Sequence, residues 1–176
     1  MAELTTIAPA EKGEEAYGQI VPLEGDSLLL PNAAVIEVRS LEGMRVRSGP
    51  PAWLLGEVSW REYELPVLSI ESLLGRPMPA RSRRTRLLII NSTGSHLDTG
   101  LFAMVCQGYP HLAALNRVAL QTIPLEARDP DELVLTRVKV ANTLAIIPDL
   151  DAIESRLVEV PDEAAAAATD WEPSQS

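Results

Sequence analysis

Short apolar runs separated by turn-forming residues dominate the hydrophobic pattern of this chain. Gly, Pro, Asp and Ser residues stand between the runs, and this spacing is typical of an all-β barrel or sandwich. Helical periodicity is confined to the segments 70–74 and 150–157. The segments predicted to be strands are 17–23, 27–30, 35–39, 86–90, 101–106, 118–123, 133–140 and 144–147.

Turns and loops are predicted where Gly, Pro or Asp interrupts these runs. The residues Glu24-Gly25-Asp26 form a predicted hairpin turn, and 44–51, which contains Gly49-Pro50-Pro51, is a predicted loop. Asn32 is interpreted as the start of a brief turn, and His111, which follows Pro110, as a turn residue.

The segment 56–67 contains a change of face. Its apolar residues fall on even positions up to Trp60 and on odd positions after Glu62. A strand cannot change face without a turn or a bulge, so we predict a hairpin with Arg61 at or beside its apex. Pro66 has no N–H group to donate and is therefore expected at an edge or a bulge.

The segments 67–73 and 147–153 resemble each other at a distance of 80 residues. Each ends an apolar run and continues with a helix-capping residue, Ser69 or Asp149, before a short apolar and acidic stretch. This similarity predicts two related half-barrels, each closed by a short helix.

The net charge of −10 arises mainly at the two ends of the chain. Residues 1–16 carry four Glu and one Lys, and 162–176 carry four acids and no base. We therefore predict a disordered leader over 1–16, one domain over 17–160 and an acidic disordered tail over 161–176. The acidic balance argues against nucleic-acid binding. One basic run is present, and it consists of Arg81, Arg83, Arg84 and Arg86. We interpret it either as a docking patch or as a solvated segment that leads into the next strand.

The expected compartment is the cytoplasm, because no signal peptide or apolar spanning segment is evident, and direct membrane insertion is not expected. The single Cys106 excludes a disulfide framework and is interpreted as a small buried hydrophobe, and two histidines make a metal site unexpected.

No credible catalytic set is present, which favours a binding protein over an enzyme that uses a cofactor or a metal. The Asp98-Thr99-Gly100 sequence matches the motif of aspartic proteases, whose chemistry requires two such aspartates and hence a homodimer here. Leu101 stands where that family prefers Ala or Ser, and His96 beside Asp98 is interpreted as loop surface. The homodimeric peptidase is kept as the enzymatic alternative.

Candidate binding residues gather in two segments. Trp, Tyr and Arg are enriched at interface hot spots, and Trp60 and Arg61 stand together at the predicted hairpin, where a guanidinium is free to bind carboxylates or carbonyls. Gly56 would let another backbone approach closely. The mixed strand with Val35, Glu37 and Val38 offers a second segment. The alternative is that these residues simply fill and solvate a barrel, with Trp60 in the core.

The same residues carry a resemblance to the CheW family, the coupling proteins of bacterial chemosensory arrays. The run Val35-Ile36-Glu37-Val38 matches the family's Val-x-Glu-Val/Ile strand, and Glu24-Gly25-Asp26 its preceding turn. The family's central motif, which includes Gly-Val-x-Asn-hydrophobic-Arg-Gly and a following Pro-Val, is matched by residues 51–70. The closing segment 144–150 is similar to the family's Leu-Leu-Leu-Asp-Leu ending, and the resemblance covers residues 17–158.

Several positions depart from the family pattern. Glu62 replaces a glycine, so we do not expect the turn to use a positive φ. Glu57, Ser59 and Ser69 replace small-apolar, Asn and Asp residues, and the loop 92–99 is enlarged. The chain therefore resembles a divergent member, similar to the ChpC-type auxiliary proteins of the system that controls type IV pili and twitching motility.

The resemblance implies two interlocked five-stranded SH3-like barrels with two or three short helices. It also implies a non-enzymatic adaptor that couples the cytoplasmic tips of methyl-accepting chemotaxis receptors to a CheA-type histidine kinase, at the inner face of the membrane in receptor arrays. A self-associating β-barrel module with an unrelated ligand is the alternative among binding proteins. The residues that the resemblance places on or near the receptor and kinase contacts, together with Trp60, are Val35, Glu37, Val38, Gly56, Val58 and Arg61.

Overall fold

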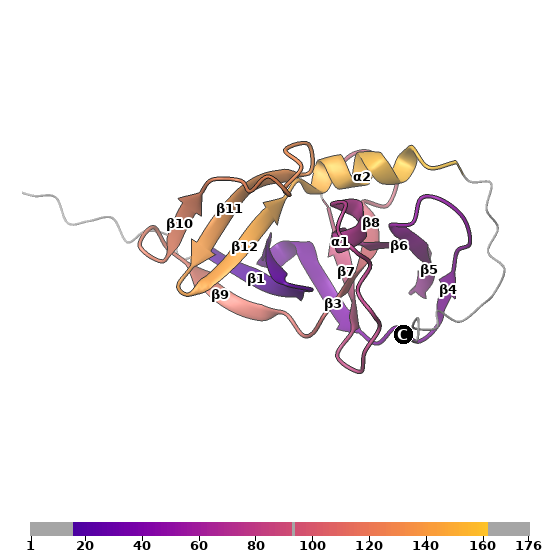
Figure 1. Cartoon of the computed structure of the whole chain (residues 1–176). Helices are drawn as coiled ribbons and strands as arrows, with labels where there is room; N and C mark the ends of the chain where they lie inside the picture. The colour runs from indigo at the N-terminus through magenta and orange to yellow at the C-terminus, as the bar shows by residue number, and fades with distance from the viewer. Residues whose placement is uncertain (1–15, 93, 162–176) are drawn as a thin grey trace, which may run out of the picture.

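The chain folds into two β-sheets with short helices between and beside them (Figure 1). The computed structural model describes residues 16–92 and 94–161, so nearly all of the predicted leader and of the predicted tail lies outside the described residues. The first sheet has the order β10 (Leu120–Ile123), β11 (Val134–Val140), β12 (Thr143–Pro148), β2 (Asp26–Pro31), β1 (Ala16–Leu23) and β9 (His111–Leu115). The second has the order β3 (Val35–Arg39), β7 (Arg86–Asn91), β8 (Leu101–Cys106), β6 (Tyr63–Ser69), β5 (Leu54–Trp60) and β4 (Met44–Val46). The helices are η1 (Asn32–Ala34), α1 (Ile70–Leu73) and α2 (Leu150–Val158).

The predicted mostly β, interlocked architecture is confirmed. The chain leaves the first sheet after β2, builds the second sheet with β3 to β8, and returns to the first sheet with β9 to β12. Each sheet has six strands where five were expected. The additional strands are β4, in the segment predicted to be a loop, and β9, which begins at the predicted turn residue His111.

Both unpredicted strands lie at sheet edges, where pairing with a single neighbour is enough to order a short segment. Among the described strands, β4 pairs only with β5, and β9 only with β1. Neither has a strong apolar alternation of its own, so tertiary pairing rather than local pattern makes them strands.

The predicted internal repeat is confirmed and extends over both sheets. Ser69 and Asp149 cap α1 and α2 by accepting from the N–H groups of Ser72 and Ala152. The hairpin β5–β6 corresponds to β11–β12, and in each case the second strand pairs in parallel with a strand of a different hairpin, β8 or β2. The two sheet orders match strand for strand, with β3 in the place of β9 and β4 in the place of β10.

The largest apolar cluster lies between the two sheets. It joins Val21 and Leu28 of the first sheet to Leu88 and Met104 of the second, and α2 adds Ile153. Two smaller clusters fill the individual barrels. Because the barrels share one core, the second sheet holds its exposed hairpin on a rigid base.

Candidate functional site

Arg61 lies at the tip of the β5–β6 hairpin, as predicted. Only Arg61 and Glu62 connect the strands, and Trp60 pairs with Tyr63 at their ends. The Arg61 side chain is exposed, and its guanidinium carbon lies 4.3 Å from the centroid of the Trp60 ring. This stacking orients the guanidinium without covering it.

The turn does use a positive φ, contrary to expectation, but at Arg61 rather than at Glu62. Arg61 has φ 54°, a left-handed value that favours glycine. The right-handed twist of the two strands demands such a turn in a two-residue connection, and in the absence of glycine the first residue adopts it.

Trp60 joins the hairpin to β3. Trp60 is 5% exposed and belongs to the core of the second barrel, while its Nε1–H donates to Glu37 Oε2 at 2.8 Å. Arg39 Nη1 donates to the Ser59 carbonyl at 3.3 Å. The structure therefore brings together three of the predicted residues, Glu37, Trp60 and Arg61, with Trp60 as the buried support of the other two.

Gly56 and Val58 do not lie on the surface. A Cβ at Gly56 would stand 1.9 Å from the Arg45 carbonyl oxygen, so the backbone that approaches this glycine is the chain's own β4 and not a partner. Val58 is 1% exposed within the core of the second barrel. Neither residue is accessible to a partner, and both shape the hairpin from within the barrel.

The two valines of β3 are anchors rather than exposed contacts. Val35 and Val38 are partly buried against the shared core and pair with Ile90 and Leu88 of β7. A bulge between Val35 and Glu37 interrupts the register, and Ile36 in between is 39% exposed. The accessible apolar side chain of this strand is therefore Ile36.

We call a set of one half-buried residue, Arg39, and four exposed residues at this end of the second sheet the β3–hairpin surface; the exposed members are Ile36, Glu37, Arg61 and Tyr63. Ile36, Arg39 and Tyr63 were not among the predicted site residues. Tyr63 flanks the turn directly and was detectable from that position, whereas the exposure of Ile36 depends on a bulge that the sequence does not signal.

An ion-pair cluster flanks this surface on β4, β5 and β6. Arg45 Nη2 lies 3.1 Å from Glu57 Oε2 and 2.6 Å from Glu64 Oε2. Ser59 Oγ donates to the other carboxylate oxygen of Glu64. Two of the departures from the family pattern, Glu57 and Ser59, thus bind their own neighbours on the sheet.

The structure does not pair His96 with Asp98. Asp98 is exposed in the loop between β7 and β8, and the His96 ring lies 3.2 Å from Asp151 on α2 rather than against Asp98.

Cys106 is buried, and burial raises the pKa of its thiol to about 11, so no thiolate forms at neutral pH. Within 16–92 and 94–161 no cluster of His, Cys, Asp and Glu is able to hold a metal ion. No helix in the described ranges has the length and apolar character needed to cross a membrane.

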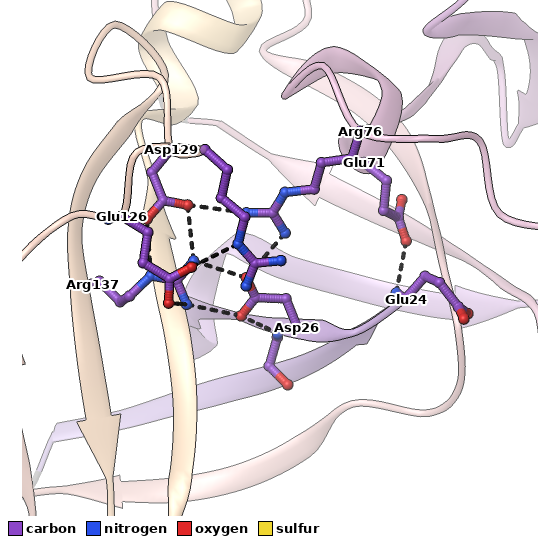
Figure 2. A network of polar contacts seen from close by, with 9 residues as sticks. Glu24, Asp26, Glu71, Arg76, Glu126, Asp129 and Arg137 are labelled. Carbon is purple, nitrogen blue, oxygen red and sulfur yellow. Dashed lines mark hydrogen bonds and ion pairs between the residues drawn. The ribbon is translucent and has the colours of Figure 1, made fainter.

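A second polar cluster is buried at the junction of the barrels (Figure 2). Arg137 on β11 is 1% exposed and donates to Asp129 Oδ1 at 2.8 Å and to Asp26 Oδ2 at 2.9 Å. Arg76, which follows α1, reaches the same two carboxylates at 3.0 Å each. The buried carboxylates pair with the guanidiniums, and among the described residues Arg76 Nε is the one atom of this cluster left without a hydrogen-bond partner. The cluster therefore holds the barrels together and offers no open site.

The fold and this geometry define a two-barrel, mostly β module whose accessible functional groups suit the binding of another protein. The family profile described as a CheW-like domain matches residues 18–157, and the chain belongs to that family. The predicted family, one of chemotaxis adaptors, is confirmed.

A solved structure agrees with the fold. The chain is similar to the scaffolding protein TtCheW from Thermoanaerobacter tengcongensis, with a TM-score of 0.64 and 14% sequence identity over 84% of this chain and 90% of that chain. A search of curated proteins finds no match.

Proposed function

We propose that this protein is a non-enzymatic adaptor that couples chemoreceptors to a CheA-type histidine kinase through the β3–hairpin surface. The observation that carries the proposal is the exposed guanidinium of Arg61, held at 4.3 Å over the buried Trp60 ring. An arginine fixed in this way loses less conformational freedom on binding than a free one, and it is able to pair with a carboxylate or carbonyls of a partner.

The composition of the surface supports a protein partner. Ile36 and Tyr63 provide accessible apolar area, while Glu37 and Arg61 present charges of both signs within one small region. Interfaces are typically enriched in Tyr and Arg, and charges of both signs provide orientation. The cytoplasmic location and the place in receptor arrays belong to this proposal.

The test is a titration of the full chain against a receptor's cytoplasmic tip and, separately, against the kinase's regulatory domain. Arg61→Ala should weaken binding to at least one of them by about 1–3 kcal/mol, which is about 5- to 150-fold in Kd. Arg117→Ala is the matched control, because Arg117 is an exposed arginine outside the β3–hairpin surface. Thermal unfolding should show both variants folded.

Glu37→Gln distinguishes two roles of Glu37, a contact of its carboxylate with the partner and the hydrogen bond that it accepts from Trp60. The amide oxygen of glutamine still accepts from Trp60 Nε1, so a loss of affinity would report a contact of the carboxylate with the partner. If both partners bind Arg61→Ala and the original chain equally, the assigned surface is wrong. If neither partner binds the original chain, the adaptor role itself is wrong.

Identification of the native kinase partner would show which motility system the adaptor serves. We expect co-purification from cells to recover a histidine kinase of either a chemotaxis or a twitching system. Recovery of copies of this chain alone would favour the self-associating module instead.

A further inference from the structure

The segment between α1 and β7 presents arginines from an ordered turn. The Ser82 N–H donates to Thr85 Oγ1 at 2.8 Å, the Arg84 N–H donates to Ser82 Oγ at 3.1 Å, and the Thr85 N–H donates to the Ser82 carbonyl at 3.2 Å. Thr85 is buried, at 3% exposure, and anchors the turn to the body of the protein. Arg83 and Arg84 therefore lie at its exposed tip. We call residues 81–86 the arginine turn.

Three arginines of this turn, Arg83, Arg84 and Arg86, form no ion pair with a carboxylate in the described part of the chain. Arg83 and Arg84 make no ion pair there, and Arg86 donates to the carbonyls of Arg83 and Thr85 at 2.8 Å each. Arg86 also lies 4.7 Å from the centroid of the Tyr109 ring, which is 60% exposed. The result is a concentrated positive patch with an adjoining aromatic ring, on a protein whose net charge is −10.

The chain itself carries a complementary segment. Residues 162–176 contain four acids, Asp162, Glu163, Asp170 and Glu172, and no basic residue. They also contain Trp171, an indole suited to stacking on a guanidinium.

Length and position allow this segment to reach the turn. Fifteen extended residues span about 50 Å, which exceeds the diameter of about 40 Å expected for a domain of this size. The segment follows Pro161, whose carbonyl lies 3.5 Å from Arg47 Nη2. Figure 1 shows α2 along the upper edge of the molecule and the loop between α1 and β7 at the lower edge, so the segment needs most of this length to reach the turn.

We propose that the acidic segment 162–176 binds the arginine turn of its own chain. Its carboxylates pair with the guanidiniums of Arg83, Arg84 and Arg86, and Trp171 stacks beside Tyr109. Tethering gives the segment a millimolar effective concentration at the turn, so an acidic partner has to displace it. Long-range repulsion by the net negative charge disfavours nucleic acid and anionic lipid as competitors.

The experiment uses the full chain with a nitroxide spin label at Ser174→Cys. The natural Cys106 is buried, and the raised pKa of its thiol keeps it unreactive toward the label. We expect paramagnetic broadening of the backbone amide signals of residues 83–86 and 109. The broadening should be lost in Arg83→Glu/Arg84→Glu and at about 0.5 M salt, which screens such pairs.

Matched variants establish that the effect depends on these charges. Arg117→Glu makes the same charge change on another exposed arginine and should leave the broadening intact. Adding Asp170→Arg and Glu172→Arg to the Arg83→Glu/Arg84→Glu chain should restore it by reversing both sides of the pairing. A dispersed amide spectrum confirms that each variant is folded.

Three results would overturn the proposal. One is the absence of broadening at the turn, and another is equal broadening in Arg83→Glu/Arg84→Glu. The third is broadening that appears only between isotope-labelled and spin-labelled chains mixed together, which would assign the segment to a second copy. If phosphatidylglycerol vesicles or duplex DNA shift the turn signals of a chain that shows no contact with its segment, the turn binds that polyanion instead.

Discussion

Arg61 and Ala141 occupy equivalent places in the β5–β6 and β11–β12 hairpins, and both are non-glycine residues with positive φ, 54° and 52°. Such a conformation costs of order 1 kcal/mol for a residue with a Cβ. At Arg61 the strained residue carries a guanidinium that is exposed and stacked on Trp60. At Ala141 the side chain is a single exposed methyl group. The contrast supports a functional reason for keeping the arginine.

Ala141→Gly should raise the free energy of unfolding by about 0.5–1 kcal/mol, because relief of the left-handed strain exceeds the entropy added to the unfolded chain. Denaturant titration measures the change. Asn142→Gly is the control, since Asn142 does not have a positive φ, and it should be neutral or destabilising. A less stable Ala141→Gly chain would contradict the assigned turn geometry.

Among the elements, β4 depends on one glycine. Its three residues pair with β5, with Val46 opposite Gly56, and a bulge between Leu54 and Gly56 brings the two backbones together. The close approach of the Arg45 carbonyl leaves no space for a Cβ. The glycine that was interpreted as an access point for a partner is therefore a requirement of the sheet edge.

Gly56→Ala should lower the free energy of unfolding by about 2 kcal/mol or more and should detach β4, because the obstructing atom is backbone and not a movable side chain. Calorimetry gives the stability change, and hydrogen exchange at residues 44–46 reports the loss of pairing. Ser59→Ala, an exposed change on the same strand, should alter stability by no more than about 0.5 kcal/mol. Unchanged protection of β4 in Gly56→Ala would disprove the close packing.

At the scale of the whole molecule, the buried ionic cluster connects what the chain order separates. Hydrogen bonds from Arg137 lower the pKa of Asp129 to about 2, against the opposing effect of burial. Burial alone would raise the pKa of Asp26, but hydrogen bonds from Arg137 and the Ser27 N–H outweigh it, and the pKa is lowered. Pairing with Asp129 in turn raises the pKa of Arg137.

The stability that these carboxylates contribute should be complete above the unfolded pKa, about 4, and should disappear as pH falls through the folded value of about 2. Unfolding free energies measured between about pH 5 and pH 2 should therefore decrease toward acid. Asp129→Asn should cost about 2–3 kcal/mol at neutral pH and flatten this dependence. Asp131→Asn, on an exposed neighbour, is the control. An equal acid slope in Asp129→Asn and the original chain would show that the cluster is not responsible.

The repeat explains which strands the local pattern missed. Two edge strands were predicted from the sequence, β10 within the segment 118–123 and β3 at Val35. In the other half of the repeat their counterparts are β4 and β9, and neither of these was predicted. An alignment of the two halves of the sequence, extended in both directions from the equivalent capping residues Ser69 and Asp149, would have found β4 and β9. Edge strands of a few residues have too little apolar alternation to be detected singly.

The sequence alone determined the strands other than β4 and β9, the capped helices, the family and the reversal of the chain at Arg61. Side-chain alternation, capping and turn formation are properties of neighbouring residues. Tertiary structure decided which of the chosen residues face solvent. Gly56 and Val58 turned inward because β4 and the barrel core cover them, and Glu37 meets Trp60 across 23 positions of sequence. Contacts between distant segments depend on strand order and bulges, which short-range patterns do not encode.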